Sequence, residues 1–178
     1  MLSLLIICAF SVSMISAVSA DEISRLLESK KPIRVFVKGF ANESGQGNVS
    51  VEDFKKTVEV SLRNRKSVIF QLVKNVEESQ IQIAGIIKQC QYLKRGPFKP
   101  SPSIAGLLLD AAATATENYA DMVAEFTIID SKTGDTLWKR DIGVYIKKLM
   151  SQAESIPLIY DKTARAFIWR SFGKLRKL

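Results

Sequence analysis

The chain has 178 residues, 26 Lys and Arg against 18 Asp and Glu, and no histidine. Without histidine, Ser–His and Cys–His catalytic dyads, histidine acid–base catalysis and histidine-ligated zinc are excluded. The length suits one domain with a real core. The net charge of +8 favours anionic partners, or else a basic and well-hydrated surface.

Residues 1–20 carry no charged side chain and contain the apolar run Leu4–Phe10. They end in the small-residue sequence Val18-Ser19-Ala20, directly before Asp21, which is typical of a cleaved secretory signal peptide. A buried N-terminal helix is the alternative. Cys8 is not expected to carry a lipid, because Ile7 precedes it where a small residue is expected. We therefore expect a signal peptide at 1–20 and a single domain at 21–178.

The first predicted elements of the domain are a strand and a helix. Ile33–Phe40 alternates, with Ile33, Val35 and Val37 on one face of a strand. A Gly- and Ser-containing loop follows over 42–48, and Ser50 is a plausible helix N-cap before two acidic residues. The apolar stripe of the predicted helix consists of Val51, Phe54, Val58 and Leu62.

Two further strands are predicted at Ser67–Val73 and from Ile81 towards Tyr92. Cys90, the only cysteine after the leader, lies in the second of these, which favours a small buried hydrophobe over a nucleophile. Residues 94–103 contain three prolines and a glycine and are predicted to form a loop. The Ala- and Leu-rich range 103–119 predicts a helix.

The C-terminal third predicts a β-hairpin and a helix. The strands are Asp121–Ile129 and Leu137–Ile146, with a bulge expected at Gly143. In the turn between them, Asp130 is expected to act as a cap, while Thr133 supplies a hydroxyl and Gly134 tolerates positive φ. The last helix, from Pro157 to Gly173, has the apolar stripe Tyr160, Ala164, Phe167, Ile168 and Phe172.

The predicted order is β-α-β-β-(α)-β-β-α. It indicates an α+β two-layer sandwich in which two main helices cover one mostly antiparallel sheet. The residues expected at the sheet–helix interface are Phe54, Val58, Phe126, Ile128, Phe167 and Ile168.

Three motifs in this order resemble a group of small bacterial envelope domains. They are Phe40-x-Asn42 after the first strand, Gly85 within Ile83–Ile87, and a hairpin carrying Asp130, Thr133, Gly134, Leu137 and Trp138. The group includes the curli secretion-channel protein, lipoprotein activators of penicillin-binding proteins and the lipopolysaccharide-assembly lipoprotein. The resemblance spans 33–147 and implies an envelope accessory role. This chain departs from the lipoprotein members by lacking a convincing lipid-attachment motif.

Catalysis, cofactors and metals have little support in the sequence. It has no glycine-rich phosphate-binding loop. Its carboxylates look scattered and form no visible ligand cluster, so we expect no metal and no cofactor. The carboxylates considered were Asp110, Glu117, Asp121, Glu125 and Asp141.

Two regions are candidate binding sites. In the first, aromatic and basic residues alternate around the end of a strand, which suits an anionic amphiphile, although an ordinary loop with one anchoring aromatic is the alternative. Its residues are Tyr92, Lys94, Arg95, Phe98 and Lys99. The second is the basic C-terminal range 169–178, where Trp169, Phe172 and Leu175 interleave with cations, as at a membrane surface or in a packed helix end.

The leading hypothesis is a non-catalytic periplasmic accessory protein for envelope assembly or secretion, which docks to an envelope or outer-membrane protein. The alternatives are a protein that binds lipopolysaccharide or anionic lipid, and an unrecognised hydrolase. The leader argues against a nucleic-acid partner and for an exported, periplasmic protein, with a peripheral position at the outer membrane as an alternative.

Overall fold

A computed structural model describes residues 23, 25, 26, 31–66, 68–94, 118–147 and 152–173. The elements are β1 (Ile33–Asn42), α2 (Val51–Arg63), β2 (Phe70–Leu72), the 3-10 turn η1 (Val76–Glu78), β3 (Ile81–Lys94), β4 (Asn118–Asp130), β5 (Thr136–Lys147) and α4 (Gln152–Phe172). The strands form one sheet in the order β2-β1-β3-β4-β5. The sheet is mixed, because β1 runs parallel to β2 and β3 while β3, β4 and β5 are antiparallel.

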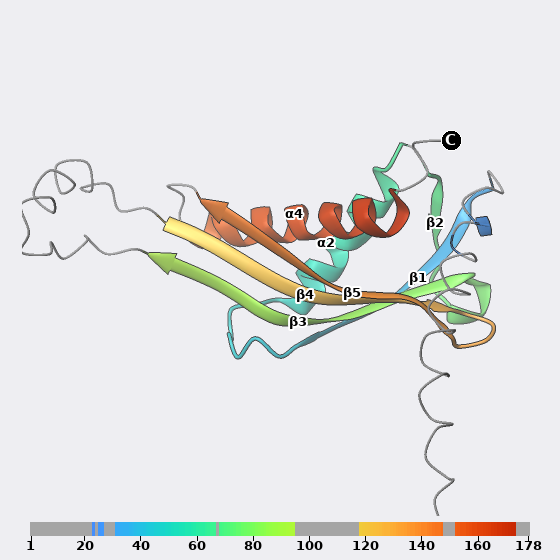
Figure 1. Cartoon of the computed structure of the whole chain (residues 1–178), viewed down its shortest axis with the longest axis horizontal. Coiled ribbons are helices and arrows are strands. Elements are labelled where there is room, and N and C mark those ends of the chain that lie inside the picture. Colours follow the sequence, from blue (N-terminus) through green and yellow to red (C-terminus); the bar gives the residue numbers. More distant parts are fainter. Residues whose placement is uncertain are drawn as a thin grey trace, which may run out of the picture.

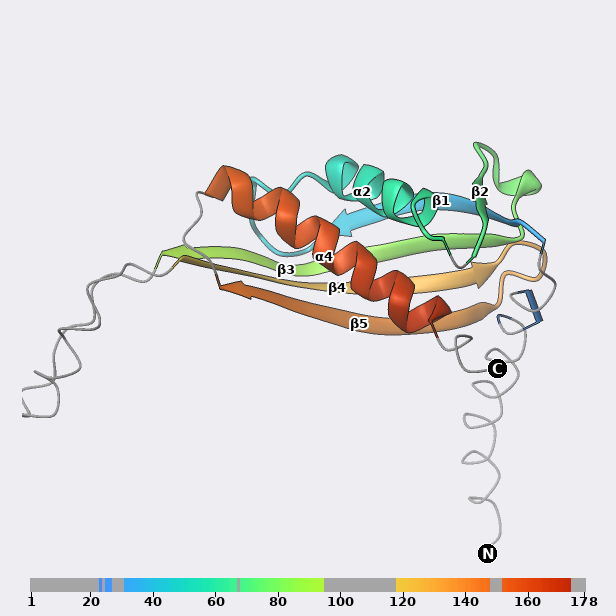
Figure 2. The same ribbon diagram turned by 90° about the horizontal axis from the view of Figure 1, so that it is seen from above.

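The molecule has two layers, as the sequence predicts. Figure 1 shows both helices on one side of the sheet, and Figure 2 shows α4 crossing the strands diagonally beside α2. The helix α2 packs mainly on β1 and β2, whereas α4 packs on β4 and β5. The predicted α+β sandwich is confirmed.

Aromatic rings fill the space between sheet and helices. The rings of Phe126 and Phe167 stack with centroids 4.1 Å apart and planes at 4°. Phe40 makes edge contacts with both Phe54 and Phe126. All six residues predicted for this interface are buried, with at most 3% of each exposed.

The glycine of the central strand is required by this packing. A Cβ atom on Gly85 would collide with the carbonyl oxygen of Glu125 and lie 2.8 Å from Cε1 of Phe40. Only a residue without a side chain leaves room for the Phe40 ring on β1. Two of the three motifs, Phe40 and Gly85, therefore work as one packing unit.

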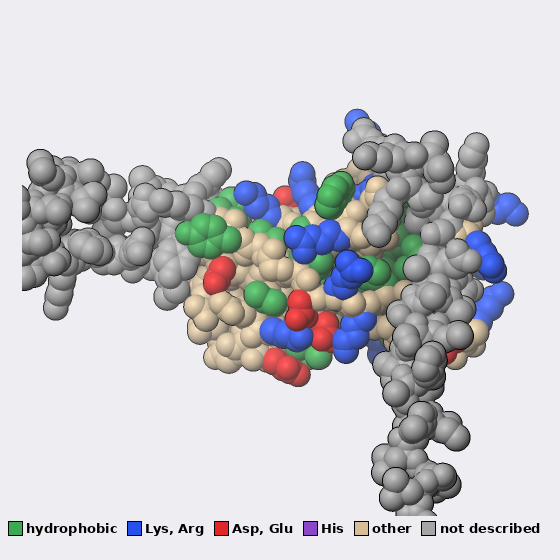
Figure 3. All heavy atoms as spheres, viewed as in Figure 1, with side chains coloured by type: hydrophobic (Ala, Val, Ile, Leu, Met, Phe, Trp, Pro, Cys, Tyr) green, Lys and Arg blue, Asp and Glu red, His purple; other side chains and the backbone are tan. Residues whose placement is uncertain are grey.

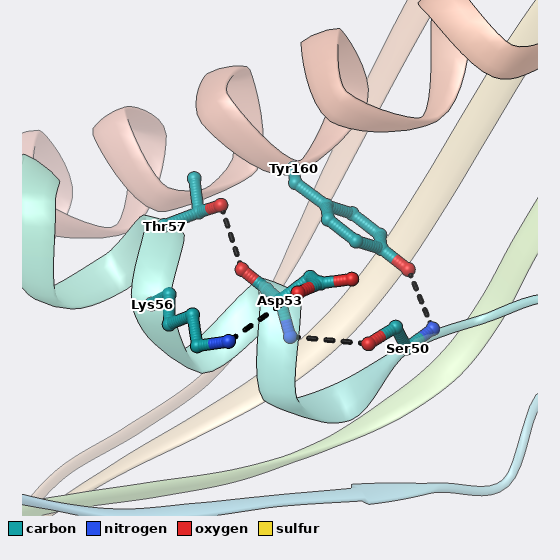
Figure 4. Close-up of polar contacts among 5 residues, drawn as sticks. All are labelled: Ser50, Asp53, Lys56, Thr57 and Tyr160. Carbon is teal, nitrogen blue, oxygen red and sulfur yellow. Dashed lines mark hydrogen bonds and ion pairs between the residues drawn. The ribbon is translucent and has the colours of Figure 1, made fainter.

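Tyr160, in the middle part of α4, is hydrogen-bonded to the start of α2 (Figure 4). The backbone N–H of Ser50 donates to the Tyr160 hydroxyl at 3.1 Å. The Ser50 hydroxyl in turn accepts from the backbone N–H of Asp53 at 3.2 Å, which confirms Ser50 as the N-cap of α2. Burial raises the pKa of the Tyr160 hydroxyl to about 12.

Two bulges change which residues face the helices. Between Val37 and Gly39 the register of β1 against β3 shifts by one residue, and Gly39 has φ +135°. Phe40 can therefore join Val37 on the covered face although the two are three residues apart. A second shift between Ile87 and Gln89 similarly buries both Ile87 and Cys90.

Several boundaries differ from the predictions. The strand predicted over 67–73 is limited to Phe70–Leu72, at an edge of the sheet. Lys94, predicted as the start of a loop, is the last residue of β3. The helix predicted over 103–119 cannot reach its predicted end, because β4 begins at Asn118; residues 103–117 lie outside the described residues.

Two predictions in the C-terminal third were wrong. The helix α4 begins at Gln152, and Pro157 lies inside it. Burial of Ser155 and Ile159 favours the longer helix over the break expected at proline. The bulge predicted at Gly143 is absent, because Gly143 pairs in register with Val123; the irregularity lies instead between Ile128 and Ile129.

Candidate functional site

The helices α2 and α4 lie on one side of the sheet, so neither covers its second face, which we call the open face (Figure 1). Along β4 the residues with even numbers from Ala120 to Asp130 are buried, and the odd-numbered ones from Asp121 to Ile129 are half-buried. This open face therefore carries a second set of side chains on the same strands. Its members on the central strands and β5 are Ala84, Ile86, Lys88, Gln89, Asp121, Val123, Glu125, Thr127, Ile129, Lys139, Asp141, Gly143 and Tyr145.

A cluster of four charged residues lies on the open face. Glu125 on β4 and Asp141 on β5 are directly opposite each other in the ladder. Lys88, at the bulge of β3, places Nζ 2.9 Å from Glu125 Oε2 and 2.8 Å from Asp141 Oδ1. Nζ of Lys139 lies 2.8 Å from Glu125 Oε1. The bulge therefore positions a lysine that contacts both carboxylates and offsets the repulsion between them.

The ion pairs fix the charge state of this cluster. Hydrogen bonds from Lys139 and Lys88 lower the pKa of the Glu125 carboxyl. Hydrogen bonds to Asp141 and Glu125 raise the pKa of the Lys88 ammonium. Glu125 and Lys88 are thus held in their charged forms near neutral pH, which suits recognition of a charged surface rather than proton transfer.

The sequence-based view that the carboxylates are scattered was wrong for Glu125 and Asp141. Their juxtaposition depends on the β4–β5 register and on a bulge in a third strand. In the sequence, the available sign of a charged outer face is that Lys139 and Asp141 are two residues apart on β5, and so face the same side of the strand. Of the three other carboxylates considered, Asp110 and Glu117 lie outside the described residues.

Asp121 and Tyr145 extend the open face towards the paired ends of β3 and β4. Oδ2 of Asp121 accepts a hydrogen bond from Gln89 Nε2 at 2.8 Å. Oδ1 is enclosed but has no hydrogen-bond partner within the described part of the chain. Tyr145 is opposite Asp121 and is 59% exposed. The enclosed Oδ1 is out of reach of a partner, whereas the exposed Tyr145 side chain opposite Asp121 is accessible to one.

Apolar side chains lie beside the charged cluster. Val123 and Ile86 are half-buried, and Gly143, which pairs with Val123, adds no side chain to cover it. Figure 3 shows acidic and basic side chains next to one another over the strands, with hydrophobic side chains among them. The surface is therefore mixed in charge and partly apolar, as docking surfaces for proteins often are.

The predicted binding loop is only partly described. Tyr92 is half-buried and packs against the core from β3. Lys94 is the last residue of β3 and pairs with Asn118, the first residue of β4. Arg95, Phe98 and Lys99 lie outside the described residues. The structure therefore places Tyr92 as an anchor at the start of this segment.

The residues of the hairpin and loop motifs have structural roles. Oδ1 of Asp130 accepts from the backbone N–H groups of Lys132 and Thr133, and Gly134 has φ +78°. Asn42 organises its loop by accepting from Ser44 and donating to the Gln46 carbonyl. The predicted turn cap is confirmed. Trp138 is half-buried and contacts Phe167 with ring centroids 5.6 Å apart, so it covers the edge of the core.

The C-terminal candidate divides into buried and exposed residues. Phe172 is 2% exposed and packs on Phe70, which confirms its place in the apolar stripe and favours the packed helix end over a membrane contact at this residue. Trp169 is 68% exposed. Cys90 is 2% exposed, and burial raises the pKa of its thiol to about 11, which confirms it as a buried hydrophobe.

Within the described ranges, no three His, Cys, Asp or Glu side chains gather where they could hold a metal ion. The helices of that same part of the chain include none that is long and apolar enough to cross a membrane.

No family model matches the sequence, and no curated protein matches it. The fold does resemble solved structures. A hypothetical protein from Chlamydia trachomatis aligns with a TM-score of 0.52 and 6% identity, covering 83% of this chain and all of the other. The PelC dodecamer of Paraburkholderia phytofirmans gives a TM-score of 0.49 and 12% identity, covering 76% and 88%.

A lipoprotein from Neisseria meningitidis aligns with a TM-score of 0.42 and 10% identity, covering 76% of this chain and 98% of the other. At these identities the similarity concerns the fold alone. The chain thus shares with the chlamydial protein a fold that extends over most of both chains.

Proposed function

We propose that this protein is a non-catalytic accessory protein of the bacterial cell envelope that docks to a protein partner through the open face of its sheet. The observation that carries the proposal is the open face itself. It combines the Lys88–Glu125–Lys139–Asp141 cluster with the exposed Tyr145. Fixed charges give orientation and specificity, and the apolar and aromatic side chains supply contact area.

The charge states in the cluster favour docking over hydrolysis. A carboxyl that acts as a general acid near neutral pH needs a raised pKa. The pKa of Glu125 is lowered instead, and its neighbour Asp141 is paired with Lys88. The hydrolase alternative predicts turnover of ester, amide or glycoside substrates by the purified protein, and we expect none across a broad substrate panel.

Affinity capture from detergent-solubilised envelope fractions tests the docking proposal. The variant Lys139→Ser/Tyr145→Ser removes two open-face side chains that are 56% and 59% exposed, so the fold should be retained. The matched control, Lys56→Ser/Val60→Ser, removes a lysine and an apolar residue that are 64% and 51% exposed on α2. We expect the wild type and the control to retain the same partner, and the open-face variant to lose it.

Equal retention by all three proteins would contradict docking through the open face. Loss of the partner by the control as well would show that the contact lies elsewhere or that binding follows net charge. Circular dichroism and urea unfolding of each variant separate these outcomes from misfolding.

A second candidate function is binding of lipopolysaccharide or another anionic amphiphile at the end of β3. It is favoured by the anchored Tyr92 and by the position of Lys94 at the end of the strand. Lys94, Arg95 and Lys99 would supply charge, and Tyr92 and Phe98 apolar contact. Replacing the three cations with Ser should then weaken lipopolysaccharide binding, most clearly at low salt, because exposed charges are screened. Unchanged binding by the folded variant would remove this segment as the site.

We propose export through cleavage after Ala20. The intact mass of protein purified from the envelope should correspond to a chain that begins at Asp21. A mass that includes Met1, or a lipid on Cys8, would contradict this route.

A further inference from the structure

The outer side of α4 carries a stripe that has no role in the fold. Lys162, Arg165 and Trp169 are spaced three and four residues apart and are all exposed. They lie opposite the buried stripe that includes Tyr160, Ala164 and Phe167, and so point away from the sheet. Trp169 is 68% exposed, the largest exposure among the large hydrophobic residues described.

The surroundings of this stripe are basic. Arg165 pairs with Asp161 at 2.8 Å, whereas Lys162 and Arg170 contact no carboxylate in the described ranges. The C-terminal end of α2 lies beside the end of α4, because Nη2 of Arg65 donates to the Phe172 carbonyl. Arg63 and Lys66 are exposed near this end. Basic side chains accordingly predominate over α4 in the upper part of Figure 3.

We propose that this outer face of α4 docks onto a bilayer that contains anionic phospholipids. The indole of Trp169 would enter the headgroup region, where amphipathic aromatic rings are favoured. Lys162, Arg165 and Arg170 would attract the phosphates. An exposed tryptophan beside exposed basic side chains fits an anionic lipid surface because one helix face meets both the apolar and the charged zones of that surface.

This orientation has a consequence for the open face. The helices and the open face lie on opposite sides of the sheet (Figure 1). A molecule bound through α4 would therefore present the Lys88–Glu125–Lys139–Asp141 cluster away from the lipid. The inference rests on the residues of α4 and α2 and does not require the proposed protein partner.

Co-sedimentation with vesicles tests the proposal. The purified protein should bind phosphatidylcholine vesicles that contain phosphatidylglycerol, should bind pure phosphatidylcholine vesicles far less, and should dissociate as salt is raised. Each basic side chain lost near an anionic membrane surface weakens binding about fivefold. The double variant Lys162→Gln/Arg165→Gln should therefore bind the vesicles about thirtyfold more weakly than the wild type. The tryptophan emission should shift to the blue on vesicle addition, and the shift should disappear in Trp169→Phe, which retains Trp138.

The matched control is Arg34→Gln/Lys38→Gln, which removes two exposed cations from β1 and lowers the net charge equally. We expect it to retain most of the binding. Equal losses of vesicle binding by the two double variants would show that binding depends on net charge alone and would overturn the proposal. It would also be overturned if the wild type bound neither vesicle, or bound both equally, or if its emission did not shift; unfolding curves confirm that each variant is folded.

Discussion

The two faces of β4 differ in almost every property although they alternate along one strand. Met122, Phe126 and Ile128 face the helices and are fully buried. Val123, Glu125 and Thr127 face outward and are half-buried on the side of the sheet opposite α2 and α4. The covered face thus holds the aromatic core, and the open face holds charged residues that the fold does not need. If the open face is the docking surface that we propose, stability and recognition are encoded by alternate residues of one strand and can be changed separately.

The largest effect is expected on the covered face. Phe126→Ala should lower the free energy of unfolding by roughly 3–5 kcal/mol, because a fully enclosed ring stacked on Phe167 leaves a cavity. Urea unfolding followed by circular dichroism measures this loss. The neighbouring open-face variant Thr127→Ala should lose much less. A loss below about 1 kcal/mol for Phe126→Ala would contradict the assignment of the faces.

A pair of glycine substitutions sharpens the comparison. Gly85→Ala should destabilise by about 1–3 kcal/mol, since its Cβ would meet the Glu125 carbonyl and the Phe40 ring. Gly143→Ala on β5 meets only Val123 Cγ2 at 3.9 Å and should be neutral or slightly stabilising. Thermal unfolding of both variants checks the difference. Equal tolerance at both positions would argue against the close contact between Phe40 and Gly85.

The buried thiol gives a prediction on pH. Burial, aided by the charge of Asp121, raises the Cys90 pKa from 9.0 to about 11. The folded state therefore holds the thiol proton more tightly than the unfolded state. The resulting stabilisation is complete below pH 9 and is lost as pH rises towards 11. Cys90→Ala should remove this part of the alkaline loss, while Tyr160 and Lys88 retain theirs. An identical alkaline profile in the variant would contradict this prediction.

The smallest expected effect on stability is at the centre of the open face. Glu125→Gln should change the free energy of unfolding by no more than about 1 kcal/mol, because the ion pairs are near the surface. The pKa of Glu125 is lowered in the folded state, so its contribution is present above the unfolded pKa and is lost as pH falls through the folded value. Unfolding at pH 7 and pH 3 measures both. A loss comparable to that of Phe126→Ala would mean that the cluster is part of the core.

Much of the fold could be predicted because the covered face leaves a periodic pattern. The stripes of Phe54, Val58 and Leu62, and of Tyr160, Ala164 and Phe167, have helical spacing and are all buried. The hairpin turn was predictable from Asp130, Thr133 and Gly134, whose chemistry is local.

The features that the sequence did not reveal depend on non-local packing. The bulge at Gly39 turns Phe40 towards Phe54, and alternation alone cannot locate it. The start of α4 at Gln152 depends on contacts that outweigh Pro157. The charged cluster requires the registers of three strands, so Lys88, Glu125 and Asp141 could not be brought together from spacing alone.

The central claim is that the open face meets a protein while the helix side does not. A photo-crosslinking amino acid at Tyr145, and separately at Val60, tests it in cells, because both positions are more than half exposed. We predict a discrete protein adduct from position 145 that is absent from position 60. Adducts of the same protein from both positions, or from position 60 alone, would contradict the account.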